Sequence, residues 1–437
     1  MTPNKRAYKG CRDFLPAQMR VRDYLFNQMK KTADSFAYEA YDGPLLEEVD
    51  LYRAKSGEEL INDQIYSFID RGNREVAIRP EMTPTLARMV AGIHKQVAKP
   101  LRWYSIPNLM RYEKPQRGRV REHWQFNVDI FGAPTNLGEI EIINVIIHFF
   151  TSFGADASMF SLNLNDRRFV DAVFTQLLKL EKEDAYKLYK VLDKSKKISV
   201  EKLDTMISEI ISEKTKQDLF KEYLALANFD DLVRFVDKNK LQEFCAEFYE
   251  FTTLLNELSL TKYVQYDPTI VRGLDYYTGI VFEIFDKHPD NNRAIAGGGA
   301  YANLLQIFNE APLAGVGFGL GDVTLKDFLE SHKLLPNLNK PKFDLFIAYT
   351  NTDDQKHSLE LANKLRANHL NIETYLGKIK FNKIFKLAES KGYQFVAVIE
   401  TRDGKTQIQI KDLTQNTQDY FDLTEYEKII QLISKDK

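Results

Sequence analysis

The sequence predicts a multidomain α+β protein in which an antiparallel β-sheet flanked by helices is interrupted by a helical insertion and followed by an α/β domain. Short apolar runs separated by polar turns fill residues 65–131, which is typical of antiparallel strands. Residues 166–258 are lysine-rich, helical in periodicity and almost free of glycine. Beyond residue 342, strand-like and helical segments alternate, as they do in α/β domains.

Length and composition indicate a globular protein with several domains. At 437 residues the chain is too long for one compact core, and its 44% hydrophobic and 28% charged residues are ordinary proportions. Because the net charge is only −2, a nucleic-acid partner would have to be bound by a local basic patch. The two cysteines lack metal-ligand spacing, and no signal peptide or membrane span is recognisable. We therefore expect a cytoplasmic protein.

The first domain, residues 1–165, should begin with a helix over residues 17–37, where apolar residues recur at three- and four-residue steps. The apolar segment 140–150 reads as a buried helix or strand. The clearest strand is 121-REHWQFNVDIFG-132, because polar and apolar residues alternate along it. One face would carry Trp124, Phe126, Val128 and Ile130, and the other His123, Gln125, Asn127 and Asp129.

The remaining boundaries follow from changes in composition. Residues 166–258 form the helical insertion, and residues 259–330 return to strand-like, glycine-rich segments that would complete the first sheet. A linker with prolines at 331–341 precedes the α/β domain, residues 342–437. In that domain we expect strands at 343–349, 371–376, 395–400 and 406–413, and helices at 355–370 and 382–391.

A basic loop beside the clearest strand is the first candidate for chemistry. The segment 111-RYEKPQRGRVRE-122 carries four arginines, and guanidinium groups suit phosphate oxygens because they make bidentate, permanently charged contacts. A solvated hairpin tip explains the same spacing equally well. The polar strand face with Gln125 and Asp129 fits either the floor of a pocket or the wet side of a sheet.

Two segments place polar residues where a core strand does not need them. The run 79-RPEMTPTLAR-88 holds Glu81 and Thr83 between two prolines, which fits fixed polar side chains or an ordinary helix start. The run 272-RGLDYYTGIVFE-283 places an arginine, an aspartate and two tyrosines before a buried strand.

Glycines and histidines add weaker signals. Three consecutive glycines in 296-AGGGAYANLL-305 allow close approach of a ligand, but they have neither P-loop nor dinucleotide-binding spacing. The seven histidines show no zinc-site spacing.

With these segments in this order, the sequence resembles the histidyl-tRNA synthetases, a family of class II aminoacyl-tRNA synthetases, over nearly all of its length. YDGPLLEEVDLY (41–52) resembles motif 1, with Pro44 and Glu47 in the dimer-forming element, and residues 111–132 resemble motif 2. Residues 79–83 resemble the Arg-Pro-Glu-x-Thr segment, and residues 272–283 the histidine-specific signature. The C-terminal α/β domain resembles the anticodon-binding domain of this group.

The resemblance implies a class II synthetase fold and roles for individual residues. Arg111 would hold the histidine carboxylate and the α-phosphate of ATP, and Arg272 would stabilise charge at that phosphate, so these two are the candidate catalytic residues. The other ATP contacts would be Glu113, near the adenine, and Arg119. Histidine would be bound by Glu81, Thr83, Arg111, Gln125, Asp129, Arg272, Tyr276 and Tyr277. The tRNA acceptor end would meet Gln116, Arg119 and Arg121.

The implied reaction is activation of L-histidine with ATP and Mg²⁺ to histidyl-adenylate, followed by transfer to tRNA(His), in a homodimer without a protein-ligated metal. The sequence departs from the family pattern at Thr324, where motif 3 has an arginine, and at Ala300 and Ala302, where an arginine and an aspartate are usual. These losses slightly favour the alternative, a non-catalytic relative that regulates ATP phosphoribosyltransferase. The intact motif 2, the histidine signature and the C-terminal domain favour the synthetase over that alternative, and the absence of a kinase-like segment disfavours a tRNA-sensing regulator.

Overall fold

The computed structural model describes residues 3–54, 60–271, 276–291, 293–338, 343–402 and 405–434. The chain divides into two compact units. The larger unit comprises residues 1–13 and 22–336, and the smaller one comprises residues 14–21 and 337–437.

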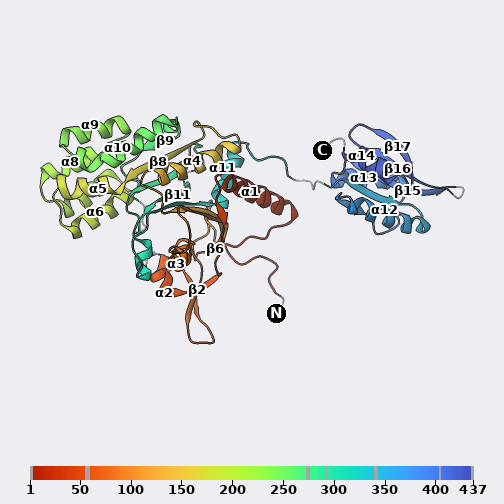
Figure 1. Ribbon diagram of the computed structural model, residues 1–437, viewed down its shortest axis with the longest axis horizontal. Coiled ribbons are helices and arrows are strands. Elements are labelled where there is room, and N and C mark those ends of the chain that lie inside the picture. The colour runs from red at the N-terminus through yellow and green to blue at the C-terminus, as the bar shows by residue number, and fades with distance from the viewer. Residues whose placement is uncertain are drawn as a thin grey trace. The chain divides into compact units, whose positions relative to one another are not determined.

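A mixed sheet forms the centre of the larger unit (Figure 1). Among the described residues its strands follow the order β1-β5-β7-β12-β11-β10-β8-β9, with β6 paired to β7. Their bounds are β1 Glu39–Ala40, β5 Leu101–Ser105, β6 Asn108–Met110, β7 Glu122–Phe131, β8 Phe160–Asp166, β9 Val264–Tyr266, β10 Ile280–Asp286, β11 Ala294–Tyr301 and β12 Gly315–Gly321.

The pairing of β7 with β12 confirms that the two β-rich blocks of the sequence complete one sheet. Most neighbours are antiparallel, as expected, but β1 pairs with β5 and β8 pairs with β9 in parallel. These two exceptions involve strands of two or three residues, β1 and β9, at opposite ends of the sheet. Such short strands carry too few residues for a periodic pattern.

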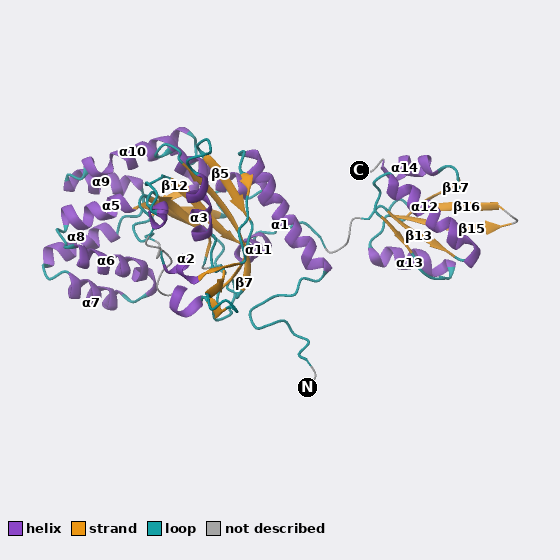
Figure 2. Ribbon diagram, turned by 60° about the horizontal axis from the view of Figure 1, so that its bottom comes forward, coloured by secondary structure: helices purple, strands orange, loops and turns teal. Residues whose placement is uncertain are grey.

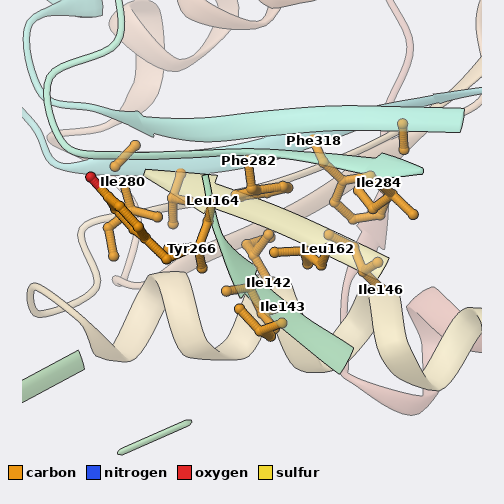
Figure 3. Packing of buried hydrophobic residues seen from close by; sticks show 14 of the residues in the cluster. Ile142, Ile143, Ile146, Leu162, Leu164, Tyr266, Ile280, Phe282, Ile284 and Phe318 are labelled. Carbon is orange, nitrogen blue, oxygen red and sulfur yellow. The ribbon is translucent and has the colours of Figure 1, made fainter. Parts of the chain in front are cut away.

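Helices α1 (Pro16–Ser35), α4 (Leu137–Ser152) and α11 (Asp322–Ser331) supply buried side chains to one large hydrophobic cluster with the sheet. The segment 140–150 is thus a helix. Figure 3 shows Ile142, Ile143 and Ile146 of α4 beneath the side chains of β8 and β10. The apolar face of β7 (Phe126, Val128, Ile130) joins this cluster, which leaves its polar face for the opposite side of the sheet.

The insertion is helical, as its composition predicts. Its helices are α5 Arg167–Ala172, α6 Lys182–Lys194, α7 Val200–Ile210, α8 Lys214–Leu224, α9 Phe229–Asn239 and α10 Gln242–Glu257. They gather at the end of the sheet that carries β8 and β9 (Figure 1). Because Phe220, Tyr223 and Phe248 are buried in the same hydrophobic cluster as the sheet, the insertion shares its core with the sheet.

A small sheet of β2 (Leu46–Glu48), β4 (Glu75–Ile78) and β3 (Tyr66–Ile69), with α2 (Val49–Arg53), lies before α3 (Thr83–Ile93). The run 79–88 therefore starts a helix, with Pro84 in its first turn, where the missing N–H costs nothing.

The smaller unit is an α/β domain in which helices cover both faces of a sheet ordered β14-β13-β15-β16-β17 (Figure 2). α12 and α14 pack on one face and α13 on the other. The sequence predicts all of these elements except β17 and α14. The bounds are β13 Leu345–Tyr349, α12 Gln355–Ala367, β14 Ile372–Thr374, α13 Phe381–Lys391, β15 Phe395–Arg402, β16 Lys405–Asp412, β17 Thr417–Asp422 and α14 Tyr426–Ser434.

Candidate active site

A small cavity of about 50 Å³ lies on the polar face of β7. Its walls come from β7, β11, β12, the start of α3 and the segment before β10. The lining residues include every described residue predicted to bind histidine: Glu81, Thr83, Arg111, Gln125, Asp129, Tyr276 and Tyr277. Asn127 and Tyr301 complete its polar lining. Residues from segments far apart in sequence thus converge on one point.

Glycines on β12 make room for the polar face of β7. Gly317 pairs with Asp129 and Gly319 with Asn127 across the two strands, so these residues share one face. A β-carbon on Gly317 would lie 2.1 Å from Oδ1 of Asp129, and one on Gly319 would lie 2.5 Å from Nε2 of Gln125. Any larger residue would push the polar side chains aside. The floor of the cavity is therefore bare backbone.

Asp129 is the buried carboxyl group of this cavity. The Tyr301 hydroxyl donates a hydrogen bond to Oδ1 of Asp129 at 2.5 Å. Burial raises the pKa of Asp129 to about 7, and the hydrogen bond from Tyr301 opposes that rise. The pKa of Tyr301 is also raised, by burial first and by the Asp129 charge second. The tyrosine thus stays a donor while the carboxyl group changes charge near neutral pH.

Arg111 ties the cavity to the segment 79–83. Its Nε donates to the carbonyl of Pro80 at 2.8 Å, directly before Glu81. Arg79 is itself fixed, because it donates to Asp42, to the Gly43 carbonyl and to the Asn108 carbonyl. These bonds fix the backbone on either side of Pro80, next to Glu81. The pair of tyrosines forms another wall, with ring centroids of Tyr276 and Tyr277 4.6 Å apart.

A second, larger cavity of about 780 Å³ also has Arg111 in its wall. It contains two further predicted ATP contacts, Glu113 and Arg119, which form an ion pair at 2.6 Å. The wall carries positive side chains and the carboxylates of Asp193 and Glu283. Since Arg111 lines both cavities, a ligand in one and a ligand in the other would meet at its guanidinium group.

The sequence reasoning missed several polar residues of the larger cavity, among them His123 and Arg293. His123 lies on the polar face of β7, and burial, assisted by the charges of Arg111 and Arg12, lowers its pKa to about 3. It is therefore neutral at physiological pH. Arg293 lies just before β11. Its only signal in the sequence is a cation next to a glycine-rich strand.

The remaining predicted residues differ in position. Gln116 and Arg119 pair through their backbones at the tip of the motif 2 hairpin, at 3.0 and 2.9 Å. Arg121 lines neither cavity: its guanidinium group is 3.9 Å from the Tyr112 ring centroid and bonds to the Glu113 carbonyl and the Tyr8 hydroxyl. Arg272 lies outside the described residues.

The three departures from the family pattern fall in two places. The Thr324 hydroxyl donates to the carbonyls of Ile295 and Gly321, at 3.1 and 3.3 Å, and its side chain lines the larger cavity. Ala300 and Ala302 instead line a separate cavity of about 240 Å³ that also holds Glu139 and Arg168.

Two negative findings apply to the described part of the chain. It contains no group of three or more His, Cys, Asp or Glu side chains placed to hold a metal ion. No helix in it has the length and hydropathy that crossing a membrane requires.

Solved structures with this fold give its class. Histidyl-tRNA synthetase from Nostoc sp. PCC 7120 matches with a TM-score of 0.81 and 20% identity, over 98% of this chain and 100% of that one. An ATP phosphoribosyltransferase regulatory subunit/histidyl-tRNA synthetase from Bacillus halodurans matches with a TM-score of 0.74 and 21% identity, over 91% of this chain and 99% of that one. The fold is therefore that of histidyl-tRNA synthetase structures.

Sequence comparison narrows the class to one family. The family model described as histidyl-tRNA synthetase matches residues 10–323, and the one described as anticodon binding domain matches residues 344–433. Histidine–tRNA ligase of Leptospira biflexa is 41% identical over 434 residues, which cover 98% of each chain. The chain belongs to the histidyl-tRNA synthetase family.

Proposed function

We propose that this chain activates L-histidine with ATP and transfers it to tRNA(His). One observation carries the proposal: the predicted histidine contacts Glu81, Gln125 and Asp129 line one small cavity, and Arg111 belongs to both this cavity and the larger one. A reaction that joins an amino acid to a nucleotide needs two adjoining sites with a cation between them. The curated relative from Leptospira biflexa carries the name of this activity.

Histidine would be selected by polar groups that only an imidazole satisfies. Asp129 would accept from a ring N–H, with Gln125, Tyr276 and Tyr277 completing the contacts to the ring. A buried carboxyl group that lacks its partner is costly, so amino acids without a ring donor would be rejected. Glu81 and Thr83 would bind the α-amino group, and Arg111 the carboxylate.

Activation would proceed in the larger cavity. A carboxylate oxygen of histidine attacks the α-phosphorus of ATP, a new P–O bond forms, and pyrophosphate leaves. Arg111 and Arg272 would stabilise the charge that develops on the α-phosphate, so both act by electrostatics and positioning. Glu113 would bind the adenine amino group and Arg119 the phosphates. Since these two side chains are paired with each other at 2.6 Å, ATP would have to separate them.

The metal enters with the nucleotide in this proposal. Mg²⁺ bound with ATP supplies positive charge at the phosphates. Glu283 and Asp193 place carboxylates in the wall of the larger cavity, and their oxygens would be the protein ligands for an ion that ATP already holds.

Transfer of the histidyl group to tRNA would follow at the carbonyl carbon of the histidyl-adenylate. A ribose hydroxyl at the end of the tRNA attacks the carbonyl carbon of the adenylate, and AMP leaves. Gln116 and Arg119 at the hairpin tip, together with Arg121, would contact the acceptor end. The smaller unit would bind the anticodon, in keeping with the family model that matches residues 344–433.

We also propose a cytoplasmic homodimer and the domain division 1–165, 166–258, 259–330, 331–341 and 342–437. The dimer is supported by exposed apolar side chains in and beside the small sheet, namely Leu45, Leu46, Phe68 and Ile69. Leu46 and Phe68 lie on the same face of this sheet, because they pair with Ile78 and Val76 of β4, and exposed apolar side chains on one face are typical of protein interfaces.

One observation favours a second candidate, a non-catalytic regulatory subunit. Thr324 replaces the arginine with which motif 3 helps to bind ATP, and its hydroxyl is already bonded to backbone carbonyls.

Histidine-dependent exchange of pyrophosphate into ATP by the purified chain separates the two candidates. We expect exchange that requires histidine and saturates with it. A folded chain that shows no exchange above background would sink the synthetase proposal and leave the regulatory one.

A further inference from the structure

Arg293 occupies the part of the larger cavity that Thr324 leaves without a charge. A β-carbon on Gly118, in the motif 2 hairpin, would lie 3.3 Å from Cδ of Arg293 and 3.6 Å from Cγ2 of Thr324. The two side chains therefore reach the same point of the cavity wall from different elements. The Thr324 hydroxyl also donates to the carbonyl of Ile295, two residues after Arg293, at 3.1 Å. This bond joins the start of α11 to the start of β11.

Arg293 has no anionic partner among the residues that the structure describes. Across the described ranges, no hydrogen bond or ion pair involves its guanidinium group. Two neighbouring carboxylates have other partners: Glu113 pairs with Arg119, and Asp286 is 2.7 Å from Nε2 of His332. Asp290 and Asp327 also line the cavity beside the hairpin, but neither is paired with Arg293. A half-buried arginine without a partner is unusual, because burial removes water from a charge that nothing else compensates.

The electrostatic surroundings of Arg293 favour an anion. Burial lowers the pKa of Arg293, and the nearby charge of Arg119 lowers it further, while Glu113 opposes both effects. Two cations on one wall repel each other until a negative group lies between them. The same wall also carries Arg111. Such an arrangement suits a ligand with several negative charges, such as a triphosphate.

We propose that Arg293 binds the β- and γ-phosphates of ATP and supplies the positive charge that Thr324 does not provide. This inference rests on the proposed function, because it assigns the triphosphate to the larger cavity. Arg293 is then a substrate-binding residue of the activation step. It lies outside the histidine cavity, because it lines the larger cavity and the adjoining cavity beside the hairpin.

Removal of the Arg293 side chain should lower the affinity for ligands that carry β- and γ-phosphates and leave the affinity for other ligands unchanged. For Arg293→Ala we expect the affinity for ATP, measured by calorimetry, and the KM for ATP in the exchange assay to worsen by about 10- to 100-fold, the range for one hydrogen-bonded charge. A sulfamoyl analogue of histidyl-adenylate, which has no β- or γ-phosphate, should bind within about twofold of its original affinity. As a control, Lys287→Ala removes a cation from the same β10–β11 connection, outside both cavities. It should change the affinity neither for ATP nor for the analogue.

A second variant tests the shared position directly. In the Arg293→Ala background, Thr324→Arg should recover about tenfold of the lost ATP affinity, because its side chain enters the same cavity. Unchanged ATP affinity in Arg293→Ala, or equal loss for ATP and the analogue, would overturn the proposal. Failure of the proposed function would look different: the unaltered chain would show no exchange, whereas the calorimetric comparison of ATP with the analogue needs no catalysis.

Discussion

Replacing Asp129 by asparagine should stabilise the larger unit and weaken histidine binding at the same time. The asparagine oxygen can still accept the hydrogen bond from the Tyr301 hydroxyl, so the local geometry is retained. The substitution removes the free-energy cost of ionising a buried carboxyl group. Histidine loses a charged acceptor, so its affinity should fall by about 10- to 100-fold.

The size of the stabilisation follows from the pKa of Asp129, which burial raises from 3.8 to about 7. The pKa of Asp129 is higher in the folded state than in the unfolded state. The contribution of this carboxyl group to the free energy of unfolding is therefore complete below pH 4, and it is lost as the pH rises to 7. Each pH unit in that window costs the folded state about 1.4 kcal/mol. Relative to the unaltered chain, Asp129→Asn should therefore gain about 1.5 kcal/mol at pH 5 and about 4 kcal/mol at pH 8.

Thermal unfolding followed by tryptophan fluorescence measures this gain. Both tryptophans, Trp103 and Trp124, belong to the larger unit, so the signal reports on that unit alone. The difference in Tm between variant and parent should widen with pH and reach on the order of 5–10 °C at pH 8. Asp13→Asn, at an exposed position, should leave Tm unchanged at every pH. A Tm difference that is the same at pH 5 and pH 8 would refute the reasoning.

Three other perturbations test separate parts of the molecule. Gly319→Ala places a methyl group against Gln125 and should raise the KM for histidine by about 10-fold or more in exchange assays. The KM for ATP should stay within about twofold. Equal changes in the two KM values would contradict the geometry. Phe68→Glu should convert a dimer into a monomer by light scattering, and an unchanged mass would argue against the proposed interface. Arg272→His should slow adenylate formation in a single turnover by about 100-fold with histidine binding still measurable, and a near-normal rate would remove its catalytic role.

The sequence predicted those parts of the site that depend on local periodicity. The alternation in residues 121–132 placed Gln125 and Asp129 opposite Phe126 and Val128, and the structure has the former on a cavity and the latter in the core. This placement could be predicted from the sequence because the side chains of a strand point alternately to its two faces, whatever the strand packs against.

Tertiary placement was the part that the sequence could not supply. The spacing of the arginines in the motif 2 loop does not show where each side chain lies, yet Arg119 lines the larger cavity and Arg121 packs on Tyr112. Arg293 and Thr324 lie on different elements, and only the pairing of β11 with β12, followed by α11, brings them to the same wall. No pattern within a single segment contains that information.

The bare backbone beneath the proposed histidine cavity affects how resistance to inhibitors could arise. A compound that rests on Gly317 and Gly319 touches positions where every substitution adds atoms within 2.5 Å of Asp129 or Gln125. A mutation that excluded the compound there would exclude histidine by the same displacement. Compounds that contact Thr324 in the larger cavity are more open to resistance, because substitutions there would leave the proposed histidine cavity intact. Inhibitors confined to the glycine floor should therefore be the harder ones for a cell to escape.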